Sequence, residues 1–124
     1  MAKARVSVER VYEDPGRAGR EHRVLVDRLW PRGLSKGAVD MDEWAKNVAP
    51  SGELRRWYGH APDRFEEFSR RYQDELGASP AAEEVTRLAA VARREGLVLL
   101  TATRDVPRSG AAVLQSVLER RGRA

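Results

Sequence analysis

The sequence predicts an α/β fold: a small single domain with a short, mostly parallel sheet of three to four strands, flanked by about five helices. Its length of 124 residues suits one core, so residues 1–124 are expected to form one domain. An unbroken apolar run, 97–102, follows a helical pattern and indicates a central strand covered on both faces. A second apolar run, 24–26, ends in a polar loop, which is typical of another buried strand.

The first strand is expected over residues 4–11, where valines alternate with polar residues. This alternation indicates an outer strand with one wet face. Residues 12–21 contain a turn at 14–16 and are too short for an ordinary crossover helix. A simple loop is therefore expected between the first two strands, and an antiparallel arrangement of these strands stays open.

Five helices are expected after the second strand. Asp40 with Glu43 three residues later is the pattern of a capping box, which predicts a short helix through Val48. A second helix is expected over 52–58, between a Ser51 cap and a left-handed Gly59, and a third over 62–76 with Pro62 as its first residue. A fourth is expected over 80–95, and a fifth begins after a Ser109 cap. The basic tail at 120–123 is expected to be frayed.

The composition limits the classes of function and of partner that the protein can have. Charged residues form 34% of the chain, the net charge is +4, and the basic side is arginine-rich, which suits phosphate or carboxylate partners. The absence of cysteine excludes disulfides, thiolate metal sites and a cysteine nucleophile. No signal peptide pattern and no apolar run near the roughly 20 residues of a membrane span is present. The expected location is the cytoplasm, with no membrane partner.

Two predicted strand ends carry similar loops, DRLWPRG after 24–26 and TRDVPRSG after 97–102. If the strands run parallel, both loops face one crevice at the sheet edge, where α/β proteins bind ligands. Arginines there would hold an anion, backbone N–H groups at Ser109-Gly110 would assist, and a tryptophan would form an apolar wall. The candidate catalytic residues are Asp27, Asp105 and His60; the candidate ligand-binding residues are Arg28, Trp30, Arg32, Trp57, Arg104, Arg108 and Ser109.

A structural interpretation of the same residues stays open. Asp27 and Asp105 can accept hydrogen bonds from loop backbone and from neighbouring arginines, which leaves a salt-bridged rim without a ligand. His60 can be an acid–base group or a hydrogen-bonding residue at a helix end. Whether the protein is an enzyme, and its oligomeric state, are left open by the sequence.

Common cofactor and metal signatures are absent: the sequence contains no HExxH, GxGxxG, Walker or GxSxG motif, so no cofactor and no metal are expected. The leading hypothesis is therefore a small anionic ligand bound at the strand ends. The second is a binding module without chemistry, which would engage nucleic acid or a protein through residues 55–58 and the basic C-terminus.

Several segments together resemble the YeaO-like branch of the domain of unknown function 488 family, over almost the whole chain: RVY, RVLVDRLWPRG, ELRRWYGH with the following PDRFEEF, and LLTATRD with AAVL. The resemblance implies a small cytoplasmic α/β domain without an established activity. The family pattern that the resemblance implies includes residues 27, 28, 30–33, 57, 60 and 105. One departure is that Arg108 and Ser109 stand where the family usually has histidine and asparagine, so a function that needs this histidine would be missing here.

Overall fold

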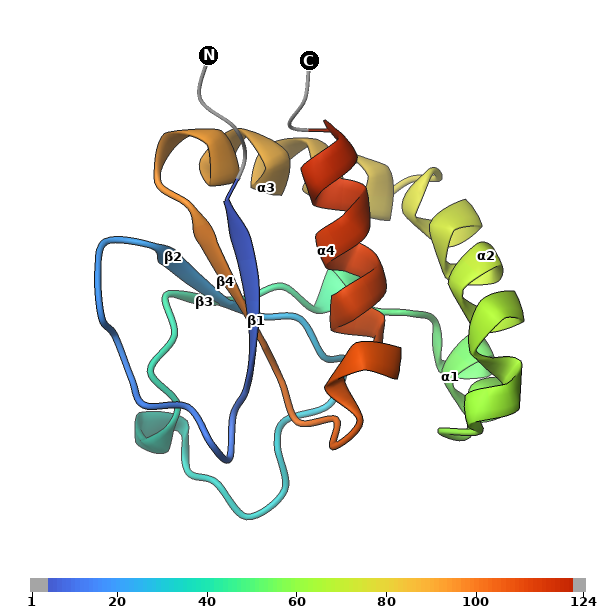
Figure 1. The fold of residues 1–124 in the computed structure, drawn as a ribbon, viewed down its shortest axis with the longest axis horizontal. Coiled ribbons are helices and arrows are strands. Elements are labelled where there is room, and N and C mark those ends of the chain that lie inside the picture. The colour runs from blue at the N-terminus through green and yellow to red at the C-terminus, as the bar shows by residue number, and fades with distance from the viewer. Residues whose placement is uncertain (1–4, 122–124) are drawn as a thin grey trace.

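The computed structural model describes residues 5–121, which form a four-stranded sheet and four α-helices (Figure 1). All strand pairs are parallel, and the strand order is β1-β4-β2-β3. This confirms the predicted α/β fold, with four α-helices in place of about five. The strands are β1 (Val6–Arg10), β2 (His22–Leu25), β3 (Glu43–Trp44) and β4 (Leu97–Thr101); the helices are α1 (Gly52–Tyr58), α2 (Phe65–Leu76), α3 (Ala81–Arg94) and α4 (Gly110–Arg121).

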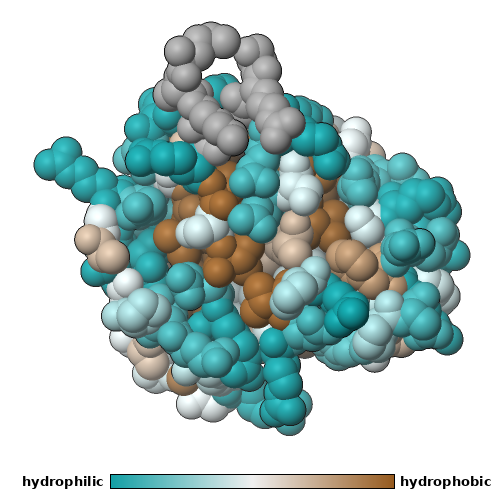
Figure 2. Space-filling view, viewed as in Figure 1, coloured by the Kyte–Doolittle hydropathy of each residue, from teal (hydrophilic) through white to brown (hydrophobic). Residues whose placement is uncertain are grey.

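Strand β4 is the centre of the sheet, as its apolar run predicts. All five of its residues are buried, because β1 and β2 pair with it on either side. Strand β1 lies at the edge, as expected from its alternating pattern. Figure 2 shows apolar residues gathered in the middle of the face over β1 and α4, with hydrophilic residues around them.

The two faces of the sheet are covered differently. Side chains such as Val24 and Leu99 belong to the larger core, which they share with α2, α3 and α4. Their neighbours Leu25 and Leu100 point the other way, since side chains alternate along a strand. Loop residues, not helices, cover that second face: Val11, Trp30, Leu34, Val39 and Met41, together with Trp44 of β3.

The antiparallel arrangement left open for the first two strands is wrong. Both β1 and β2 run parallel to β4, which lies between them. The segment 11–21 returns along the sheet without a helix, because an extended chain covers about 3.3 Å per residue. Buried Arg23 of β2 anchors this segment: it pairs with Asp14, and its Nε donates a 2.5 Å hydrogen bond to the Asp40 carbonyl.

The helix predicted from Asp40 to Val48 is also wrong. The structure forms β3 there, followed by a 3-10 turn at Lys46–Val48. Backbone pairing with β2 takes the place of helical hydrogen bonds, with Ala45 N–H donating to the Leu25 carbonyl at 2.9 Å. The Asp40 carboxylate accepts from the Arg17 backbone N–H at 2.9 Å and so caps no helix. Tertiary pairing overrides the local signal.

The remaining helix boundaries follow the predicted caps. The Ser51 hydroxyl accepts from Leu54 N–H at 3.1 Å, and Gly59 ends α1 with φ +54°. A 3-10 turn at Pro62–Arg64 precedes α2. The Ser109 hydroxyl caps α4 by accepting from Ala112 N–H at 3.1 Å. The predicted frayed tail is wrong for its first two residues, 120 and 121, which belong to α4, while 122–124 lie outside the described residues.

Between residues 5 and 121, no helix combines the length and the apolar character that crossing a membrane requires.

Candidate functional site

The loops after β2 and β4 begin at the same edge of the sheet, because these strands run parallel with Leu25 opposite Leu100. Asp27 connects the two loops. Its Oδ1 accepts a 2.8 Å hydrogen bond from the Thr101 hydroxyl, and its Oδ2 accepts a 2.7 Å bond from the Ala102 N–H. The first residue of the DRLWPRG motif therefore contacts the two residues directly before the TRDVPRSG motif, at the edge of the sheet where the sequence suggests.

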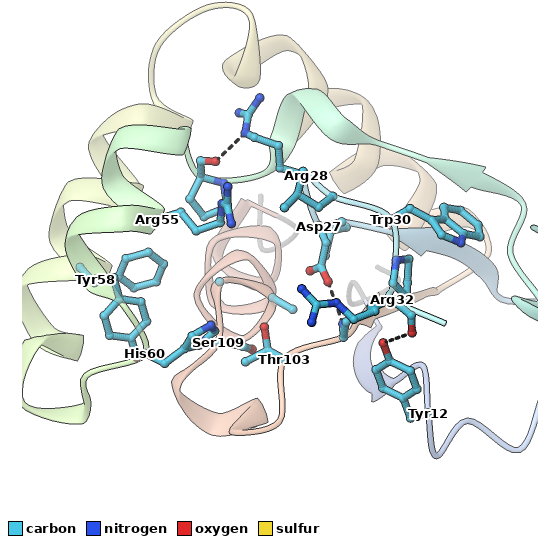
Figure 3. Close-up of a pocket in the computed structure, with 18 residues that line it drawn as sticks. Tyr12, Asp27, Arg28, Trp30, Arg32, Arg55, Tyr58, His60, Thr103 and Ser109 are labelled. Atoms are coloured by element: carbon cyan, nitrogen blue, oxygen red, sulfur yellow. Dashed lines mark hydrogen bonds between the residues drawn. The ribbon is translucent and has the colours of Figure 1, made fainter. Parts of the chain in front are cut away.

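A cavity of about 460 Å³ opens at this edge (Figure 3). Small-molecule sites commonly measure about 300–1,000 Å³, so the volume suits a small organic ligand. The walls come from loop 26–32, the end of α1, residues 102–103 and the first turn of α4. The polar side chains of this strand-end pocket include Tyr12, Asp27, Arg28, Arg32, Arg55, His60, Thr103 and Ser109.

Asp27 is a partly buried carboxyl in the pocket wall. Burial raises its pKa above the ordinary value of 3.8, although the hydrogen bonds from Ala102 and Thr101 and the charges of Arg55 and His60 act in the opposite direction. A raised pKa suits an acid–base group. Both oxygens are nevertheless bonded within the protein, as the structural interpretation expects, and the arginine next in sequence makes no bond to this carboxylate.

The three arginines of the pocket differ in what they contact. Arg28 turns away from the pocket centre, and its Nε donates to the Pro50 carbonyl at 3.0 Å (Figure 3). The exposed Arg32 and Arg55 extend from opposite walls toward the space beside Asp27 (Figure 3). Neither guanidinium makes a hydrogen bond or ion pair within the described part of the chain. Arg32 and Arg55 are therefore the two cations available to a ligand.

His60 is held at the pocket by an uncommon backbone conformation. It has φ +56°, directly after Gly59 with φ +54°. A left-handed non-glycine residue costs roughly 1–2 kcal/mol, so the fold constrains it here. Its ring lies 6.3 Å from the ring of Tyr58, which stacks on Phe68 at 4.1 Å and donates a 2.6 Å bond to the Arg108 carbonyl. The imidazole thus sits on a rigid aromatic wall.

Two predicted ligand-binding residues of the pocket also have structural tasks. The Trp30 ring packs edge-on against Trp44 at 5.2 Å, and its Nε1 donates to the Leu34 carbonyl at 2.6 Å. The buried Ser109 hydroxyl donates to the Val106 carbonyl at 2.6 Å while it caps α4. The following Gly110 allows close packing, because a Cβ there would lie 3.2 Å from Cγ of Pro50.

Four candidate residues lie outside the pocket wall. Asp105 and Arg108 form an exposed ion pair at 3.0 Å, and Arg104 is exposed without contributing to the wall. Trp57 faces away, where the guanidinium of Arg71 lies 4.3 Å from its ring centre. The structure therefore groups the first strand-end loop with His60 and Ser109, and leaves Trp57, Arg104, Asp105 and Arg108 apart.

Sequence reasoning did not single out Arg55, Tyr12 or Thr103 as residues of this pocket. Arg55 had a usable signal, because the predicted helix 52–58 puts it one turn before Tyr58 on the same face. Tyr12 had none: its hydroxyl reaches the Arg32 carbonyl at 2.8 Å across twenty residues of sequence. Only the folded chain brings these segments together.

The segment 55–58 does not present its two aromatic residues on one surface. Tyr58 is only 7% exposed and belongs to the core, whereas Trp57 lies under Arg64 and Arg71. A stacking platform for nucleic acid bases would need both rings accessible on one face. Within residues 5–121, no three His, Asp or Glu side chains converge as a metal site would require.

The fold and the pocket together describe a small parallel α/β protein with an arginine-flanked cavity at the carboxyl edge of its sheet. The chain belongs to the domain of unknown function 488 family, as a YeaO-like member: the family described as "Inactive DUF488-N3 subclade" matches residues 5–123.

Two relatives show how far the similarity extends. The uncharacterized protein Rv3073c of Mycobacterium tuberculosis is 49% identical over 121 residues, which cover 98% of this chain and 99% of the relative. The uncharacterized protein YeaO of Escherichia coli is 38% identical over 110 residues, which cover 88% and 92% of the two chains. No solved structure shows a significant match.

Proposed function

We propose that this protein binds a small anionic ligand, bearing phosphate or carboxylate, in the strand-end pocket and does not transform it. The observation that carries this proposal is the pair Arg32 and Arg55, which reach into one cavity from opposite walls and form no ion pair with any of residues 5–121. Guanidinium groups present parallel N–H donors that match phosphate and carboxylate oxygens. The proposed setting is the cytoplasm, as the sequence predicts.

The pocket supplies further support for an anion. The first N–H groups of α4 have no acceptor inside the helix, and residues 109–111 line the cavity. Unpaired N–H groups and the helix dipole favour negative charge at such an end. Arg28, fixed on the Pro50 carbonyl, adds a positive charge at the wall. Together these groups favour an anion over a neutral ligand.

Binding without turnover is favoured by three observations. Both Asp27 oxygens are held by Thr101 and Ala102, so this carboxyl has little freedom to move protons. The second candidate acid–base residue, Asp105, lies outside the pocket in an ion pair with Arg108. The matching subclade is described as inactive. The pocket therefore fits a protein that binds a ligand without catalysing a reaction.

Calorimetric titration with inorganic phosphate, sulfate and small carboxylates tests the proposal. Arg55→Gln and Arg32→Gln should each weaken phosphate binding about tenfold, since a hydrogen bond to a charged group is worth roughly 1.5–3 kcal/mol. Arg56→Gln is the matched control, because Arg56 is an exposed neighbour on α1 that does not line the cavity. The proposal is wrong if no anion binds, or if the control weakens binding as much as Arg55→Gln.

A further inference from the structure

The strand-end pocket has a negative group among its positive ones, and this restricts the anion it can hold. Asp27 lines the same cavity as Arg32 and Arg55. A carboxylate has about four acceptor sites, and the bonds from Thr101 and Ala102 use two of them. An anionic group in direct contact with the Asp27 oxygens would be repelled. The part of the ligand that contacts Asp27 must therefore donate hydrogen bonds, as hydroxyl groups do, while the anionic part contacts the Arg32 and Arg55 guanidinium groups.

The exposed part of the pocket wall includes two large apolar side chains. Among the described residues, Tyr12 and Leu29 are the large hydrophobic side chains that are exposed, at 41% and 60%, and both line this cavity. The Tyr12 ring is held in place, because its hydroxyl donates to the Arg32 carbonyl and the Arg10 guanidinium lies 4.8 Å from its centre. The fixed Tyr12 ring offers an apolar contact for a flat group, and Leu29 adds exposed apolar surface to the same cavity.

We infer that the ligand is a nucleoside monophosphate, which rests on the anion binding proposed above. Its phosphate contacts Arg32 and Arg55, its sugar hydroxyls donate to Asp27, and its base contacts the apolar side chains of Tyr12 and Leu29. These three chemical parts match the three kinds of group in the wall. The volume of about 460 Å³ suits a molecule of this size.

Matched ligands test the inference without altering the fold. Adenosine monophosphate should bind at least tenfold more tightly than ribose 5-phosphate, which lacks the base. The 2′,3′-dideoxy form of adenosine monophosphate should bind about tenfold more weakly than the parent, because it cannot donate to Asp27. Leu29→Ser, at an exposed position, should weaken nucleotide binding severalfold and leave the affinity for ribose 5-phosphate unchanged.

The outcomes separate the two proposals. If ribose 5-phosphate and inorganic phosphate bind and Arg55→Gln weakens them, but adenosine, guanosine, cytidine and uridine monophosphates bind no more tightly, the nucleotide inference is wrong and anion binding stands. If the dideoxy form binds as well as its parent, the role assigned to Asp27 is wrong. If none of these phosphates binds, both proposals fail.

Discussion

At the scale of single residues, a buried tyrosine hydroxyl bonds a backbone group far away in the sequence. Tyr72 of α2 is 1% exposed, and its hydroxyl donates a 2.5 Å hydrogen bond to the Val48 carbonyl. Burial raises the pKa of Tyr72 well above its ordinary value, so the phenol stays protonated and remains a donor. This hydrogen bond connects the 3-10 turn that follows β3 to helix α2.

Tyr72→Phe should lower the free energy of unfolding by about 1–3 kcal/mol, because it leaves the Val48 carbonyl buried without its donor. Urea denaturation measures the change. Tyr12→Phe is the control: it removes the same hydroxyl from an exposed bond to the Arg32 carbonyl, and should cost less than about 0.5 kcal/mol. Equal losses in the two variants would contradict the explanation.

At the scale of elements, the short helix α1 depends on its ends. Its seven residues are too few for a stable isolated helix. Ser51 stabilises the first turn by accepting from Leu54 N–H, and it also bonds Glu75 of α2 through its backbone N–H at 2.8 Å and its hydroxyl at 2.6 Å. The cap therefore also holds α1 on α2, which places Arg55 and Tyr58 at the pocket.

Ser51→Ala should destabilise the protein by about 1 kcal/mol, the usual cost of losing a helix cap. It should also weaken anion binding, because α1 carries Arg55. Thermal and urea unfolding measure the first effect, and phosphate titration the second. Ser35→Ala is the matched control, since Ser35 precedes a 3-10 turn without making a side-chain cap. A Ser51 variant as stable as the Ser35 variant would exclude this role.

At the scale of the whole molecule, charged side chains link the sheet to the helical layer. Glu43 of β3 accepts from Arg87 of α3 at 2.6 Å and from His22 of β2 at 2.6 Å. The Arg87 hydrogen bond holds the pKa of Glu43 below its ordinary value. Burial opposes ionisation of Asp42, but bonds from Arg23 N–H and Arg17 outweigh it and lower its pKa as well.

These lowered pKa values predict a loss of stability in acid. Both carboxyls bind protons more readily in the unfolded chain, so their stabilisation is present above their ordinary pKa values and is lost as the pH falls through the lowered ones. Asp27 has the opposite sign: burial raises its pKa, so its contribution falls as the pH rises through the acidic range.

Arg87→Gln removes the hydrogen bonds that Arg87 donates to Glu43 and to its helix neighbour Glu84, and it leaves Asp27 unchanged. The variant should lose less stability than the native protein between pH 7 and pH 3, by on the order of 1 kcal/mol. Arg93→Gln, an exposed change on the same helix, should lose as much as the native protein. Urea unfolding at both pH values gives the comparison. Parallel curves for Arg87→Gln and the native protein would refute the assignment.

Patterns local in sequence allowed most elements to be predicted. The run 97–102 became the buried central strand, and the caps Ser51, Gly59 and Ser109 lie where their residue types predict. The capping-box pattern at Asp40 failed because β2 offered its free edge to residues 42–45. A local preference worth about 1 kcal/mol yields to several inter-strand hydrogen bonds.

The candidate site was only partly predictable, for a related reason. Asp27, Arg32 and His60 follow elements that are readable from the sequence, so their place at the sheet edge could be expected. Arg55 needed the helical phase of α1, and Tyr12 needed the path of a loop that contains no regular pattern. Trp57 was misplaced because adjacent residues of a helix lie about 100° apart around its axis, so Trp57 and Tyr58 cannot share one face.

The sequence by itself determined the class of the fold, the central strand and the two polar loops at strand ends, because apolar periodicity and turn residues act over a few neighbouring positions. The tertiary structure alone decided that β4 separates β1 from β2, that residues 43–44 become a strand, and that Arg55 and Asp27 line one pocket. Those outcomes depend on contacts between segments far apart in the chain. The relative energies of such contacts cannot be inferred from a local sequence pattern.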